Sequence, residues 1–207
     1  RMGHPVLRQR AREITDPTAP EIRHLVNDMI ETMVDADGAG LAAPQVHIGL
    51  RLVIFKAPPD RAEEAGNDEE EASGTIDLTI LINPDYEPLS DEKTLGWEGC
   101  LSVPGLNGAV PRYNHIRYSG VDLDGARIER EATGFHARVA QHEIDHLDGL
   151  LYPMRMTDMT TFGFNAEPGT LATAGNTETL EPLFQDMVDA WPDRKKWQAW
   201  AAERSRG

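Results

Sequence analysis

The chain of 207 residues contains one cysteine, Cys100, so no disulfide can form within it. Structural disulfides are typical of secreted and extracellular proteins, and their exclusion favours a reducing compartment. The segment at residues 1–5 also lacks the apolar core of a secretory signal. We therefore expect a cytoplasmic protein.

Long apolar runs and an excess of basic residues are also missing. No stretch approaches the roughly 20 apolar residues that a membrane-spanning helix needs, so we expect no membrane association. Lysine and arginine number 20 against 35 aspartate and glutamate residues, which gives a formal net charge of −15. Because nucleic-acid binding depends on neutralising phosphates with basic side chains, we expect no nucleic-acid partner, whether sequence-specific or general.

The pattern His-Glu-x-x-His at residues 142–146 is the strongest chemical signal in the chain. Residues four apart share one face of a helix, so His142 and His146 can bind one metal ion together. Glu143 lies beside them, where its carboxylate can handle a proton of water during metal-assisted hydrolysis. The pattern supplies only two ligands, and the third decides which enzyme this is.

Three positions could complete the metal site. One class of zinc protease has a third histidine where this chain has Tyr152, so that completion fails. A second class takes a glutamate from a later helix, but Glu167 is followed by Pro168 and Gly169, which do not fit a helix. The third candidate is Cys100, whose thiolate is a good ligand for Zn(II) or Fe(II) and would leave one tetrahedral position open.

A run of small residues at positions 38–44 ends at Gln45. Small residues let backbone groups approach a ligand closely, and the amide of Gln45 can donate a hydrogen bond to a developing oxyanion. Taken alone, the run is also consistent with a glycine-rich turn after a helix. Its spacing differs from that of dinucleotide- and phosphate-binding motifs, which disfavours those ligands.

Helices and strands do not alternate regularly along the chain, which favours an α+β fold. Hydrophobic periodicity predicts helices at residues 20–34 and 134–147, and strands at residues 50–55, at 78–83 and, as a pair, within 111–131. We therefore predict an α+β fold with mixed, mostly antiparallel sheets around a central metal-binding helix.

Three segments stand in a fixed order along the chain: Gly38–Gln45, Glu98–Ser102 and Gln141–His146. Together they resemble the peptide deformylase family, which carries the patterns G-x-G-L-A-A-x-Q, E-G-C-L-S and Q-H-E-x-D-H. One segment alone is moderate evidence, whereas the three in order are highly specific. The resemblance extends from about His4 to about Met156, and the chain beyond it carries no family motif.

The resemblance implies a role for each residue at the reacting centre. The metal ligands would be Cys100, His142 and His146. Glu143 would act first as general base and then as general acid. The oxyanion donors would be the amide of Gln45 and the backbone N–H of Leu101.

The resemblance also implies a cleft in which an extended peptide pairs with the protein as an added strand. The residues lining this cleft would be Gly38, Ala39 and Gly40. The first side chain of the substrate needs an apolar pocket. The candidates for its walls are Leu101, Val139, the apolar part of His142 and the stem of Arg138.

The family's activity gives the expected function. It removes the formyl group from the formylmethionine end of newly synthesised polypeptides and releases formate. We expect one divalent metal ion, which is usually Fe(II) in this family, with Zn(II), Ni(II) or Co(II) as substitutes. A non-catalytic protein that retains the fold is disfavoured, because the implied ligands and both Gln45 and Glu143 are intact.

Three residues depart from the family pattern. Arg138 stands where an apolar pocket residue is common, and we expect its stem to line the pocket while its charged head reaches water. Ala39 is smaller than the usual aliphatic residue, and Asn107 stands where an arginine is often found near the path of the peptide. Arg138 and Asn107 motivate an alternative function, a deformylase-like amidase that acts on a different small acyl amide. The family pattern also predicts a structural ion pair between Glu98 and Arg112.

We divide the chain into a peptide deformylase-like catalytic domain at residues 1–157, a linker at 158–177 and a C-terminal helical extension at 178–207. An acidic insertion at residues 58–74 is expected to be a solvated loop between two strands. The C-terminal extension contains basic clusters in an otherwise acidic chain. Two interpretations of it are open: a ribosome contact near the exit of the nascent chain, or an amphipathic helix that packs on the catalytic domain.

Overall fold

The computed structural model describes residues 1–56 and 78–166. The acidic insertion at residues 58–74, the rejected ligand Glu167 and the predicted extension at 178–207 lie outside these ranges. Within them, no helix combines the length and the apolar character that crossing a membrane requires.

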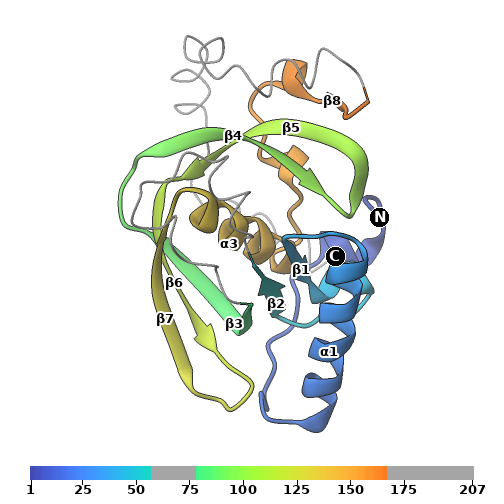
Figure 1. The fold of residues 1–207 in the computed structure, drawn as a ribbon, viewed down its shortest axis with the longest axis vertical. Helices are drawn as coiled ribbons and strands as arrows, with labels where there is room; N and C mark the ends of the chain where they lie inside the picture. Colours follow the sequence, from blue (N-terminus) through green and yellow to red (C-terminus); the bar gives the residue numbers. More distant parts are fainter. Residues whose placement is uncertain (57–77, 167–207) are drawn as a thin grey trace.

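Two antiparallel sheets surround one buried helix (Figure 1). The larger sheet has the strand order β1 (Gly40–Ala42), β2 (Leu52–Phe55), β3 (Thr79–Pro88), β6 (His115–Val121) and β7 (Arg127–Thr133). The smaller sheet has the order β4 (Lys93–Cys100), β5 (Val103–Tyr113) and β8 (Gly163–Phe164). In residues 1–56 and 78–166 the helices are α1 (Pro20–Asp35) and α3 (Gly134–Leu147), with short 3-10 turns η1 (Pro5–Arg8), η2 (Ala43–Val46), η3 (Tyr152–Met154) and η4 (Met159–Thr161). The predicted α+β class is confirmed.

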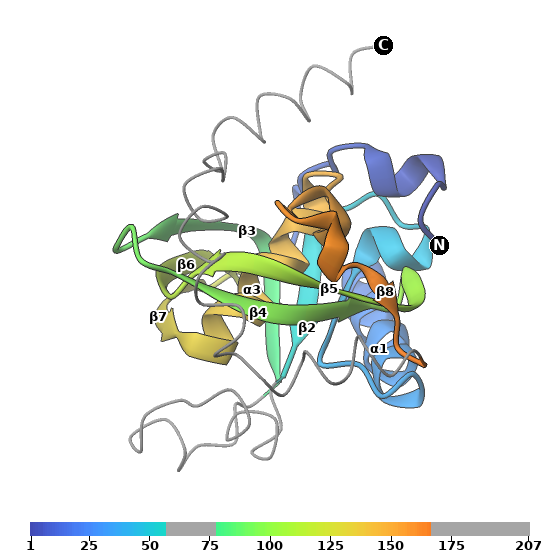
Figure 2. The ribbon, with the colours of Figure 1, turned by 90° about the horizontal axis from the view of Figure 1, so that it is seen from above.

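Helix α3 lies between the two sheets, and Figure 2 shows the β4–β5 hairpin passing over it. Ala137, Ala140, Ile144 and Leu147 on α3 are fully buried and belong to the same apolar cluster as residues of β2 and β6. A buried helix enclosed by both sheets is a rigid platform, so side chains on it are held in defined directions.

Strand β2 is apolar throughout because both of its faces are covered. Val53 and Phe55 belong to the cluster around α3, whereas Leu52 and Ile54 pack in a second cluster with Met29 and other residues of α1. The β1–β2 edge is therefore enclosed by a helix on each side. This packing fixes the segment that follows α1 and carries the glycines of positions 38 and 40.

Both predicted helices are confirmed, and the strands predicted at residues 50–55 and 78–83 correspond to β2 and β3. The pair predicted within 111–131 corresponds to β6 and β7. The β4–β5 hairpin was not predicted, because glycine and proline interrupt its apolar alternation at Gly96, Gly99, Pro104, Gly105, Gly108 and Pro111. It matters most for function, since Cys100 ends β4 at the tip of this hairpin.

The packed structure continues beyond residue 157, where we placed the boundary of the catalytic domain. Strand β8 pairs with β5, with Phe164 opposite Leu106 and Gly163 opposite Asn107. Residues 158–164 are therefore part of the smaller sheet and its surroundings, although we predicted them as the start of a linker. The rest of the predicted linker, residues 167–177, lies outside the described ranges.

Candidate metal centre

Helix α3 carries an unusual number of buried polar side chains: Gln141, Glu143, Asp145 and His146 are each at most 4% exposed. Burying a polar group is costly unless it has partners, so such a helix is held by the polar contacts around it. The side-chain amide of Gln141 is an example. Its Oε1 accepts a hydrogen bond from the backbone N–H of Tyr113 at 3.1 Å, and its Nε2 donates to the carbonyl of Tyr113 at 2.8 Å. These bonds tie α3 to the end of β5.

The structure brings the three predicted metal ligands together. The ligand atoms of Cys100, His142 and His146 all lie within 4.8 Å of one another. Sγ of Cys100 lies 3.4 Å from Nε2 of His146. Burial by itself would raise the pKa of the Cys100 thiol, but His146 and His142 hold it well below its ordinary value. A thiolate with two imidazoles is a donor set that suits Zn(II) or Fe(II).

Glu98 determines which nitrogen of His142 faces this centre. Its Oε2 lies 2.8 Å from Nδ1 of His142, which leaves Nε2 of the ring for a metal ion. Arg112 donates to both oxygens of the same carboxylate, at 2.7 and 2.8 Å, so the predicted ion pair of Glu98 and Arg112 is confirmed. Burial alone would raise the pKa of Glu98, yet Arg112 holds it well below its ordinary value.

A second buried carboxylate, that of Asp145, continues this network. Asp145 accepts a hydrogen bond from Nη1 of Arg112 at 2.5 Å and a two-pronged contact from Arg155. All three side chains are at most 2% exposed. Arg112 therefore joins Glu98 of β4 to Asp145 of α3, and so connects the strand that carries Cys100 to the helix that carries both histidines.

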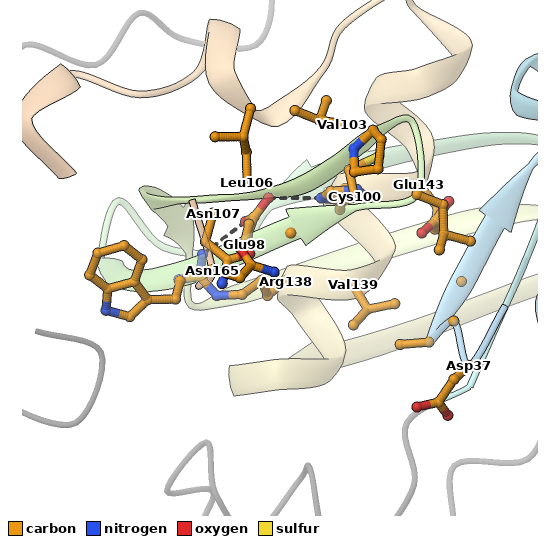
Figure 3. A pocket seen from close by; sticks show the side chains of 18 of the residues that line it. Asp37, Glu98, Cys100, Val103, Leu106, Asn107, Arg138, Val139, Glu143 and Asn165 are labelled. Carbon is orange, nitrogen blue, oxygen red and sulfur yellow. Dashed lines mark hydrogen bonds and ion pairs between the residues drawn. The ribbon is translucent and has the colours of Figure 1, made fainter. Parts of the chain in front are cut away.

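Glu143 lies in the pocket beside these ligands (Figure 3). Its side chain is buried, and its Oε2 has no hydrogen-bond partner among the described residues. Burial raises the pKa of Glu143 to about 7. A carboxyl group with a pKa near neutrality can both accept and return a proton, as general acid–base catalysis requires.

Gln45 is held so that its amide nitrogen faces the ligands. Its Oε1 accepts a hydrogen bond from the backbone N–H of Ala42 at 2.8 Å. This contact directs Nε2 to within 3.5 Å of Sγ of Cys100 and 3.3 Å of Oγ of Ser102. Leu101 stands between these two residues at the hairpin tip, and its side chain is 40% exposed.

A pocket with a volume of about 680 Å³ opens over the ligands (Figure 3). All six predicted substrate-binding residues line it: Gly38, Ala39, Gly40, Leu101, Arg138 and Val139. Lining residues that we did not predict include Trp97, Val103, Leu106, Phe135 and Asn165. Phe135 shares the predicted helix face with Val139, so periodicity could have identified it. The others come from the unpredicted hairpin and from the segment after β8.

The expected orientation of Arg138 was wrong. Its head does not reach water: the residue is 9% exposed, and Nη1 donates to Oε1 of Glu98 at 2.9 Å and to the carbonyl of Val110 at 2.8 Å. Nη2 donates to the carbonyl of Thr94 at 2.7 Å. A buried carboxylate and strand carbonyls are strong acceptors, and together they replace the solvent that we expected the guanidinium to seek.

Metal-assisted hydrolysis needs three protein ligands that leave one position open, a carboxylate beside that position and a pocket for the substrate. Helix α3 and the β4–β5 hairpin bring together residues that could supply these parts, an arrangement typical of metal-dependent hydrolases. Comparison with known proteins narrows the class. The profile of the family described as polypeptide deformylase matches residues 1–162, and the chain belongs to this family.

Relatives and solved structures agree with this assignment. The chain is similar to peptide deformylase 1 of Bordetella pertussis, with 56% identity over 164 residues that make up 79% of this chain and 89% of the relative. It is similar to the Met-Ala-Ser-bound class I type b peptide deformylase from Acinetobacter baumannii, with 32% identity, a TM-score of 0.64, and coverage of 74% of this chain and 93% of that one. For peptide deformylase from Plasmodium falciparum the identity is 28% and the TM-score 0.66, with coverage of 91% and 94%. As a member of the family, the protein is a hydrolase that removes the formyl group from newly synthesised peptides.

Proposed function

We propose that the protein hydrolyses the formyl amide of N-terminal formylmethionine, with Cys100, His142 and His146 as ligands of one divalent metal ion. The observation that carries this proposal is the convergence of their ligand atoms within 4.8 Å of one another. They converge in a pocket that also contains Glu143 and Gln45. A divalent ion held there would lower the pKa of a water molecule and polarise the formyl carbonyl.

Glu143 moves the proton in the proposed reaction. Its unpartnered oxygen accepts a proton from the water that attacks the formyl carbon, and the same carboxyl group returns this proton to the departing amine nitrogen. Breaking the bond between the formyl carbon and this nitrogen yields formate and a peptide with a free N-terminus. A pKa of about 7 for Glu143 suits both halves of this exchange.

Gln45 and Leu101 stabilise the oxyanion that develops on the formyl oxygen. The contact between Oε1 of Gln45 and the backbone of Ala42 fixes Nε2 as a donor before the substrate arrives. The backbone N–H of Leu101 is the second donor, next to Cys100 at the hairpin tip. Donors that are already in place need no reorganisation during the reaction, which is why they stabilise a transition state effectively.

The peptide would lie along Gly38, Ala39 and Gly40, pairing with the protein as an added strand. The pocket for its first side chain is bounded by Leu101, Val139 and the stem of Arg138. An apolar pocket of this kind fits a methionine side chain. The Acinetobacter baumannii structure, which has Met-Ala-Ser bound, supports a peptide that begins with methionine as the ligand.

Fe(II) is the metal that we propose for the cell, with Zn(II), Ni(II) or Co(II) as substitutes. The thiolate and imidazole donor set accepts all of these ions. We also propose a cytoplasmic location, a catalytic domain that includes residues 1–157, and a C-terminal extension at 178–207 that contacts the ribosome. Ribosome co-sedimentation of a variant that lacks residues 192–207 tests this contact. If the variant sediments with ribosomes as the full chain does, the proposed contact is wrong.

Turnover of three substrates tests the proposed function. Under anaerobic conditions, formate release from formyl-Met-Ala should exceed release from formyl-Leu-Ala, and acetyl-Met-Ala should not be hydrolysed at a comparable rate. The proposed preference for methionine would be wrong if the leucine peptide reacted equally well. Faster turnover of the acetyl peptide would instead favour the alternative amidase.

A further inference from the structure

Arg138 and His142 stand one turn apart on α3, and both reach the same carboxylate on β4. Nη1 of Arg138 donates to Oε1 of Glu98 at 2.9 Å, and Nδ1 of His142 lies 2.8 Å from Oε2. Figure 3 shows Arg138 and Glu98 next to each other at the wall of the pocket. Glu98 thus connects the guanidinium of Arg138 to the ring of His142.

The guanidinium of Arg138 is itself anchored to both strands of the hairpin. Besides Glu98, it donates to the carbonyl of Thr94 on β4 and to that of Val110 on β5, at 2.7 and 2.8 Å. A planar group with several donors in fixed directions is held rigidly by such contacts. Arg138 therefore acts as a fixed support for one oxygen of Glu98, while Arg112 supports the carboxylate from another direction.

Gly96 provides the space for this arrangement. A Cβ atom at Gly96 would lie 2.8 Å from both Cζ and Nη2 of Arg138, closer than real Cβ contacts come. Gly96 is not required by its backbone, since its φ lies outside the left-handed region. A side chain at position 96 and the guanidinium of Arg138 would occupy the same space. The glycine at 96 and the arginine at 138 therefore depend on each other.

We propose that Arg138 is a positioning residue for the metal centre, which holds Glu98 so that Glu98 holds the ring of His142, with Gly96 as its matched partner. This rests on the proposed ligand role of His142. Groups that bond the outer nitrogen of a metal-bound histidine fix its orientation and its tautomer, and losing one typically weakens metal binding 10- to 100-fold. Arg138 is one contact further out, and Arg112 remains, so the effect belongs at the lower end of that range.

Co(II) is a suitable probe, because its visible absorption reports the geometry of its ligands and its affinity can be measured by competition with a chelator. We expect Arg138→Leu to weaken Co(II) binding about 10-fold and to shift the visible bands. Arg117→Leu is the matched control, since Arg117 is an exposed arginine that pairs with Glu87 and Glu131 away from the centre. It should change neither readout. Both measurements are independent of turnover.

Gly96→Ala tests the pairing separately and remains informative if Arg138→Leu folds poorly. Its Cβ would displace the guanidinium, so Co(II) binding should weaken, whereas Gly49→Ala should have no effect because nothing lies within 4 Å of that Cβ. In the Arg138→Leu background, Gly96→Ala should weaken Co(II) binding much less than in the unaltered protein, because the two sites are coupled.

Several results would overturn the proposal. Co(II) affinity and absorption within two-fold of the unaltered protein in Arg138→Leu would show that Arg138 does not position His142. If Gly96→Ala weakened Co(II) binding equally in the unaltered protein and in Arg138→Leu, the two positions would not be coupled. A change in KM for formyl-Met-Ala with unchanged Co(II) binding would mean that Arg138 only shapes the pocket. If the unaltered protein itself bound no Co(II), the proposed metal centre would be wrong instead.

Discussion

The carboxyl group of Glu143 fills the space that a side chain at Gly40 would need. A Cβ atom at Gly40 would be 2.6 Å from Cδ of Glu143, nearer than any ordinary contact. Gly40 is the first residue of β1 and pairs with Phe55, so the strand that would bind the peptide also forms one wall around the proposed proton carrier. No other residue type fits at this position without moving Glu143.

Gly40→Ala is therefore expected to lower kcat by roughly 100-fold, because a misplacement of about 1 Å at a reacting group has an effect of that size. Bound metal should be unchanged, since Glu143 is not a proposed ligand. Gly49→Ala is the control, as its Cβ meets nothing within 4 Å. Formate-release kinetics and metal analysis check both variants, and an unchanged kcat in Gly40→Ala would show that Glu143 can move without loss.

Gln45→Glu tests the proposed oxyanion donor. The carboxylate can still accept the hydrogen bond of Ala42, but it cannot donate to an oxyanion. We expect kcat to fall by about 10²- to 10³-fold, as for the loss of a side-chain oxyanion donor in other hydrolases, with metal content unchanged. If kcat stays within two-fold of the unaltered enzyme, Gln45 does not have this role.

Cys100→Ala separates ligation from proton transfer. It removes the thiolate from the proposed donor set, so bound metal and formate release should be lost together. Metal analysis after dialysis is the measurement. One metal ion per chain in this variant would show that another residue completes the site, and Cys100 would then no longer be a ligand.

The network of Asp145 should contribute strongly to stability. Asp145→Asn leaves the buried guanidinium groups of Arg112 and Arg155 without their counter-charge, and such losses cost about 3–5 kcal/mol. Glu129→Gln removes the partner of the exposed Arg127, and exposed pairs contribute only ~0–1 kcal/mol. Urea unfolding at a fixed metal concentration measures both. Equal effects of the two substitutions would contradict the importance of the buried network.

The metal-binding helix could be predicted from the sequence, because its chemistry requires residues that are close together in the chain. The histidines must be four apart on one helix face, and α3 has the predicted bounds. The helix at residues 20–34 was equally accessible, since its apolar spacing reflects one buried face against β1 and β2.

The orientation of Arg138 and the β4–β5 hairpin could not be predicted, because both depend on contacts between segments that are distant in the sequence. Arg138 was expected to extend to water because its acceptors lie 28 to 44 positions away along the chain, at Val110, Glu98 and Thr94. The β4–β5 hairpin has few apolar alternations. Its position is supported by Arg112 of β5, which bonds across to Asp145 of α3, and by Arg138 of α3, which bonds to both strands of the hairpin. Nothing in the sequence connects Gly96 with Arg138, and only the folded structure shows that the guanidinium fills the space beside this glycine.

The substitution Glu143→Gln separates proton transfer from metal binding, and anaerobic formate release from formyl-Met-Ala with metal analysis of the same sample measures both. Glutamine keeps the size of the side chain but cannot carry the proton. We expect one metal ion per chain, as in the unaltered enzyme, with kcat lowered by about 10²- to 10⁴-fold. Unchanged turnover with the metal retained would contradict this expectation, because proton transfer would then not pass through Glu143.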